Sequence, residues 1–199
     1  MDEQNTKHCI AFEGSRRIAS GDLEQVVVKV KQVVDRGGED PVLIFDDFTS
    51  EVIEVDLRGA LSEVLMRLEK PAAADGPVNV DHNVARGPGR PKLGVVSREV
   101  TLLPRHWDWL NSQPGGASVA LRKLVEEARR VNSGKDKVRH SQETAYRFMS
   151  SMAGNLPGFE EAARALFAGN AGRFDSLVEP WPADVRDHAR KLASEALGG

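Results

Sequence analysis

The side chains of this sequence that could do chemistry are mainly basic, and they gather in the middle of the chain. Residues 86–140 hold twelve lysines and arginines against five aspartates and glutamates, whereas the remaining residues hold 15 basic and 25 acidic ones. Such a concentration of positive charge favours an anionic partner, for example the phosphates of a nucleic acid. Docking of the basic segment on the acidic remainder of the chain would satisfy the same charges.

The sequence patterns that would indicate catalysis are weak. Asp46 and Asp47 could present two carboxylates at the end of a strand, but aspartates are also typical of a hairpin turn. We find no phosphate loop, nucleophile elbow or metal-binding helix motif. The histidines are scattered along the chain: His8, His82, His106, His140 and His188. We therefore expect a protein that is not an enzyme and needs no metal or cofactor.

A strand followed by two helices is predicted for residues 98–128. The run "REVTLL" (98–103) alternates polar and apolar residues, and Pro104 suits the first turn of a helix. The helix "PRHWDWLNSQ" should end at Pro114-Gly115-Gly116, after which Ser118 can cap a second helix. Apolar residues of that helix recur at spacings of three and four residues, as on one face of an α-helix: Ala117, Ala120, Leu121, Leu124, Val125 and Ala128. One strand and two helices cannot bury so many apolar side chains, so the unit should need a partner.

This order of elements resembles the ribbon-helix-helix DNA-binding fold, in which two chains pair their strands into a ribbon that enters the major groove. The resemblance implies a homodimer that binds DNA. It also implies base contacts from Thr101, with Arg98 or Glu99, and a phosphate contact by the amides of Ala117 and Ser118.

Two registers of the strand remain open. If Val100 and Leu102 face the dimer core, then Ser97, Glu99 and Thr101 face DNA, and Glu99 can accept a hydrogen bond from cytosine N4. The opposite register presents Arg98 to DNA, but it turns Val100 and Leu102 outwards and loses apolar burial.

The preceding segment "RGPGRPK" (86–92) contains a Gly-Arg-Pro tripeptide that resembles the core of an AT-hook. In an AT-hook the arginine enters an A·T-rich minor groove. Pro88 stands where the hook has its first arginine, so half of the core is present. The resemblance implies contacts of Arg86, Arg90 and Lys92 with phosphates or the minor groove. A stiff polar linker is the alternative interpretation.

The chain divides into four predicted regions of an α+β protein. Residues 1–70 form a small α+β domain with the order strand, strand, helix, strand, strand, helix: 7–13, "RRIAS", "DLEQVVVKVKQVVDRGG", "PVLIFDD", "EVIEVDL" and "GALSEVLMRLEK". In its first helix Asp22 is the predicted cap, although the many valines leave a strand possible. Residues 71–92 are a proline- and glycine-rich linker. Residues 93–134 are the ribbon-helix-helix-like segment, and 135–199 are helical.

Over its whole length the sequence resembles an uncharacterised bacterial family, a domain of unknown function. The stretches that carry the resemblance are "IFDDFTSEVIEVDLRG", "GRPKLGVVSREVTLLPRHWDWL", "PGGASVALRKLVEEARR" and "MAGNLPGFEEAARALFAGN". The resemblance implies one architecture for the chain and brings no activity with it.

Taken together, these patterns predict a cytoplasmic, homodimeric DNA-binding protein, and we expect a transcriptional regulator. The polar start "MDEQNTKH" is unlike a signal peptide, no apolar run is long enough to span a membrane, and the single Cys9 is expected to be a buried, inert thiol. One alternative is a non-catalytic structural or interaction protein whose basic middle docks on its acidic domains. Another is that the N-terminal domain is a small-ligand sensor coupled to the ribbon, although the sequence shows no pocket motif for it.

Overall fold

The computed structural model describes residues 8–38, 40–69, 96 and 98–198. The chain divides into two compact units. The first unit joins the residues before 72 with those after 132, and the second consists of residues 72–132. The described elements are a small sheet and a set of helices, which confirms the predicted α+β class. None of the described helices combines the length and apolar character that a membrane span requires.

The first unit begins with an antiparallel sheet of three strands in the order β2-β1-β3. Strand β1 (His8–Glu13) pairs with β2 (Arg16–Asp22) on one side and with β3 (Val42–Asp46) on the other. Between β1 and β2, Gly14 has a φ of +53°, which a residue without a Cβ adopts at no steric cost. The predicted first hairpin is confirmed.

Helix α1 (Leu23–Asp35) follows β2 and packs on one face of the sheet. Asp22 caps the helix as predicted, because its side chain accepts a hydrogen bond of 3.0 Å from the amide of Gln25. Gly37 follows the helix with a φ of +76°. Helix α2 (Leu61–Glu69) lies beyond β3, and its buried Val64 joins the same core cluster as Cys9, Ala11 and Val26.

The predicted second hairpin is correct in its first arm and wrong in its second. After β3, residues 51–58 form no strand, and a single bridge joins Phe45 to Val52. The alternating side chains of Ile53, Val55 and Leu57 nevertheless pack on the core under α1. The alternation therefore correctly indicated which side chains pack on the core, but it did not indicate whether the backbone forms hydrogen bonds of a β-ladder.

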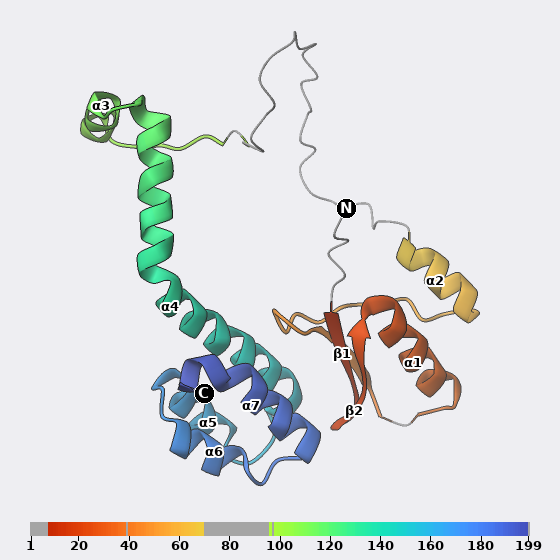
Figure 1. The fold of residues 1–199 in the computed structure, drawn as a ribbon. Coiled ribbons are helices and arrows are strands. Elements are labelled where there is room, and N and C mark those ends of the chain that lie inside the picture. The colour runs from red at the N-terminus through yellow and green to blue at the C-terminus, as the bar shows by residue number, and fades with distance from the viewer. Residues whose placement is uncertain (1–7, 39, 70–95, 97, 199) are drawn as a thin grey trace. The chain divides into compact units, whose positions relative to one another are not determined.

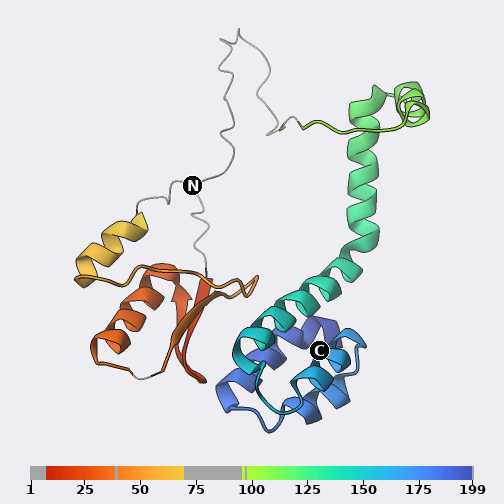
Figure 2. The same cartoon turned by 180° about the vertical axis from the view of Figure 1, so that it is seen from behind.

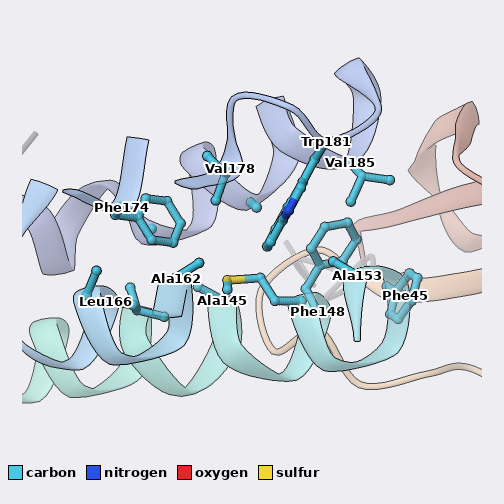
Figure 3. Packing of buried hydrophobic residues seen from close by; sticks show 14 of the residues in the cluster. Phe45, Ala145, Phe148, Ala153, Ala162, Leu166, Phe174, Val178, Trp181 and Val185 are labelled. Atoms are coloured by element: carbon cyan, nitrogen blue, oxygen red, sulfur yellow. The ribbon is translucent and has the colours of Figure 1, made fainter. Parts of the chain in front are cut away.

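The C-terminal part of the chain is helical, as predicted. Helices α5 (Phe159–Phe167), α6 (Ala171–Val178) and α7 (Ala183–Leu197) gather around the C-terminal half of α4 (Gly116–Ala153), and the two opposite views agree (Figures 1 and 2). Helix α4 is continuous across the predicted boundary at residue 134 between the ribbon-helix-helix-like segment and the helical C-terminal region. Trp181 packs inside this group (Figure 3), and its indole Nε1 donates a hydrogen bond of 3.0 Å to Pro157 O.

The second face of the sheet is covered by these helices. Ile10, Phe12 and Phe45 belong to the same buried cluster as Phe148 on α4. The ring of Phe148 lies 5.4 Å from each of the rings of Phe12 and Phe45, and Figure 3 shows Phe45 beside it. Strand β1 is thus buried on both faces. Residues 1–70 and 135–199 were predicted as separate regions, so the core that they share was not predicted.

Candidate functional site

The predicted nucleic-acid-binding residues fall into two groups. Arg86, Arg90 and Lys92 of the predicted arm lie outside the described residues. The other predicted residues belong to the second unit, in the segment before α3 (Pro104–Ser112) and in the first turn of α4.

The predicted strand at 98–103 is absent from this chain. These residues form no ladder, although the last of them, Leu103, has extended backbone angles (φ −67°, ψ 150°). A strand requires a neighbour that accepts and donates its backbone hydrogen bonds, and residues 98–132 contain no second strand. Arg98, Glu99 and Thr101 are all exposed.

The two helices that follow are confirmed, with one correction at the start of the second. Pro104 opens α3 as predicted. Helix α4 begins at Gly116, so Ser118 lies in its first turn and is not its cap, and the Ser118 hydroxyl accepts a hydrogen bond of 3.3 Å from Arg122 Nη2. The glycines made an earlier start possible, because Gly115 and Gly116 adopt φ values of +87° and +74°. The amides of Ala117 and Ser118 therefore lie in the helix's first turn, where amides lack intrahelical acceptors.

Helices α3 and α4 leave an apolar surface open. Leu110 and Ala120 are buried. Beside them lies a cavity of about 300 Å³, whose lining includes Leu102, Trp109 and Leu124. Two of the side chains that line it, Trp109 and Leu124, are about half exposed, and we call this surface the α3–α4 apolar face. Patches of this kind on a small unit are typical of an interaction surface.

A second cluster of polar side chains lies in the first unit, at the turn after β3. Asp46 Oδ1 accepts hydrogen bonds of 2.9 Å from the amides of Phe48 and Thr49, so this aspartate stabilises the turn. Asp47 has a different role. Its carboxylate lies 2.8 Å from Lys191 Nζ on α7 and 3.2 Å from His8 Nδ1 on β1. Asp47 therefore links the sheet to the C-terminal helices.

His188 lies behind this carboxylate, and its side chain is buried. Its Nε2 is 4.0 Å from Asp47 Oδ1, too far for a hydrogen bond, and this atom has no hydrogen-bond partner in the described part of the chain. Its ring packs against Phe148 at 4.6 Å. Burial lowers the pKa of His188 from 6.5 to about 4, with Asp47 opposing the shift and Lys191 adding to it. The imidazole is therefore neutral at pH 7.

Beside Asp47 the first unit contains a cavity of about 510 Å³, which we call the Phe48 cavity. It lies among the turn at 47–48, residues 136–144 of α4 and residues 191–195 of α7. No group of three or more metal-ligating side chains occurs in the described segments. The sequence pattern favours Asp47 as a turn residue or as one of two carboxylates at a strand end, and it indicates no distant partner. No local spacing could have indicated the cavity, because its walls come from three distant segments.

Comparison with known proteins gives one match. No curated protein and no solved structure matches the chain. The ribbon-helix-helix and AT-hook resemblances therefore stay predictions that these comparisons do not support. Residues 8–193 match the model of the family DUF2239, described as an uncharacterized protein conserved in bacteria. The chain thus belongs to this bacterial family, as the resemblance over its whole length implied.

Proposed function

We propose that this protein is a homodimeric DNA-binding protein, in which residues 98–103, α3 and the first part of α4 form a ribbon-helix-helix-like unit with a second copy. One observation carries the proposal: residues 98–103, which have no strand partner in the described chain, lead into two helices whose apolar face is open. A second copy would supply a strand to pair with the first and apolar side chains to cover this face.

The lining of the cavity beside α3 favours one of the two strand registers. Leu102 lines it together with Trp109 and Leu124, so the side of the segment that carries Leu102 faces the helices. In the proposed strand the side chains alternate, so Val100 would share this side. Glu99 and Thr101 would then face the DNA. This register supports base contacts by these two side chains over contacts by Arg98.

Arg122 adds a cation at the proposed phosphate contact. Its guanidinium reaches back to the first turn of α4, where Nε donates a hydrogen bond of 3.1 Å to Ser118 O. The amides of Ala117 and Ser118 and this guanidinium together present positive charge to a phosphate. Arg122 is not among the contact residues predicted from the sequence. Its spacing of four residues from Ser118 was the available signal.

A role at the bacterial chromosome would make the protein cytoplasmic, and we expect a transcriptional regulator. The test combines light scattering, which measures the molar mass, with fluorescence anisotropy of a labelled A·T-rich duplex from low to physiological salt. We expect a dimer whose affinity falls steeply with salt, because bound phosphates release counterions. Replacing Arg90 and Lys92 together should lower the affinity for any duplex.

Two pairs of variants make the test specific. Leu124→Lys places a charge in the α3–α4 apolar face and should give a folded monomer that no longer binds DNA, whereas Val34→Lys on α1 should stay dimeric. In a plot of log affinity for DNA against log salt concentration, Arg122→Gln should reduce the slope by about one. Arg129→Gln, further along the same helix, should leave this slope unchanged. A wild-type monomer without affinity for DNA would refute the proposal and favour the alternative, an interaction protein whose basic middle docks on its own acidic domains.

A further inference from the structure

The Phe48 cavity is not used by the proposed DNA contacts. Its volume of about 510 Å³ lies in the range of sites that bind small molecules, and its surface is mainly apolar with polar groups at a few points. All of its walls belong to the first unit. The positions of its aromatic and charged side chains indicate which ligand it suits.

One end of the cavity presents an aromatic ring that is held in place. Phe48 is 71% exposed, yet its ring stacks on His140 with centroids 4.3 Å apart and an interplanar angle of 32°. The backbone of this turn is fixed as well, because Phe48 O accepts a hydrogen bond of 3.3 Å from Thr144 Oγ1. Phe48 therefore offers an ordered apolar surface to a flat aromatic ligand.

The register of α4 against α7 places two charged residues at the other end. Phe148 meets His188 at 4.6 Å, whereas the Ser141 hydroxyl accepts a hydrogen bond of 3.2 Å from the amide of Ala196. The two helices therefore run antiparallel. Lys137 on α4 lies three residues, about 4.5 Å, before His140, and Glu195 on α7 lies four residues, about 6 Å, beyond Lys191, so both lie about one turn from the residues that meet the turn at 47–48.

These two residues carry the uncompensated charges of the cavity lining. Asp47 pairs with Lys191, and Asp136 lies 2.8 Å from Arg139. Lys137 and Glu195 have no ion-pair partner among the residues that the structure describes. The lining thus offers one ammonium group and one carboxylate at the end away from Phe48.

We propose that the Phe48 cavity binds a small aromatic zwitterion, a free aromatic amino acid. Its ring would lie on Phe48, its carboxylate would meet Lys137 and its ammonium group would meet Glu195. Such a ligand carries its ring at one end and both charges at the other, as the cavity presents Phe48 at one end and Lys137 and Glu195 at the other. This site stands on the first unit alone and does not depend on whether the protein binds DNA.

The test is calorimetric titration of the full-length protein with L-phenylalanine, 3-phenylpropionate and 2-phenylethylamine. The first ligand carries both charges, the second lacks the ammonium group, and the third lacks the carboxylate. We expect one L-phenylalanine per chain and an affinity at least about fivefold higher than that of either analogue, because each analogue leaves one charge of the site unmatched.

Variants assign the contacts. Phe48→Ala should weaken L-phenylalanine binding about tenfold, and Lys137→Gln should remove the advantage of L-phenylalanine over 2-phenylethylamine. Lys135→Gln is the matched control on the same helix, outside the cavity lining, and should bind like the wild type. Circular dichroism of each variant checks that the fold is kept. Absence of binding, equal affinities for the three ligands, or unchanged binding by Phe48→Ala would each overturn the proposal.

Discussion

Protonation of His188 should make the stability of this protein depend on pH. The ring is 3% exposed and packs against Phe12 and Phe148, and burial lowers its pKa to about 4. The charged groups near it are Asp47, which favours protonation, and Lys191 and Arg17, which oppose it. In the unfolded chain this histidine regains its ordinary pKa of 6.5.

The sign and size of the effect follow from the two pKa values. Well above pH 6.5 the imidazole is neutral in both states and contributes no pH dependence. Between pH 6.5 and 4 the unfolded state takes up the proton first, so the free energy of unfolding falls as the pH is lowered. The difference between the folded and unfolded pKa values corresponds to about 3 kcal/mol in the free energy of unfolding. About 2 kcal/mol of this is lost between pH 7 and pH 5.

The assay is urea unfolding of the wild type and of His188→Leu at pH 7 and pH 5, with the free energy of unfolding as the readout. Between these two pH values the variant should lose about 2 kcal/mol less than the wild type. His106→Gln removes an exposed histidine and should keep the wild-type pH dependence. Equal losses in the wild type and in His188→Leu would show that burial of this imidazole does not set the acid sensitivity.

Further stability predictions follow from packing and caps. Phe148→Ala should lower the free energy of unfolding by about 3–5 kcal/mol, because the ring is fully buried, whereas Tyr146→Ala on the exposed side of the same helix should cost clearly less. Asp22→Ala and Asn170→Ala each remove a side chain that caps a helix and should cost about 1 kcal/mol apiece. Denaturant unfolding measures all four, and a double cap variant should lose the sum, because the caps belong to different helices.

Patterns within one segment predicted most of the elements correctly. The Gly14 turn, the Asp22 cap and the Pro104 start all depend on residues a few positions apart, and each is present in the structure. The wrong predictions arose where a second local or tertiary feature competed with the sequence pattern. Ser118 suits a cap, but two glycines allowed α4 to begin earlier, and the alternating residues at 51–57 pack on the core without forming a strand.

One sequence pattern indicated that the second face of the sheet is covered by other elements. In "CIAF" four consecutive residues of β1 are apolar, and all four are buried. Such a run is typical of a strand covered on both faces. It indicated that a second layer exists, but it could not indicate which segment supplies that layer.

The sequence by itself determined the local elements and the concentration of basic residues in the middle of the chain. It also determined that α3 and the start of α4 carry more apolar side chains than these short elements can bury. Local backbone preferences and side-chain periodicity are sufficient for these features. Only the tertiary structure brought Asp47 to Lys191 and His188, and Phe48 to His140. Contacts between such distant residues depend on how whole helix and sheet faces pack against one another, and no spacing along the chain encodes that packing.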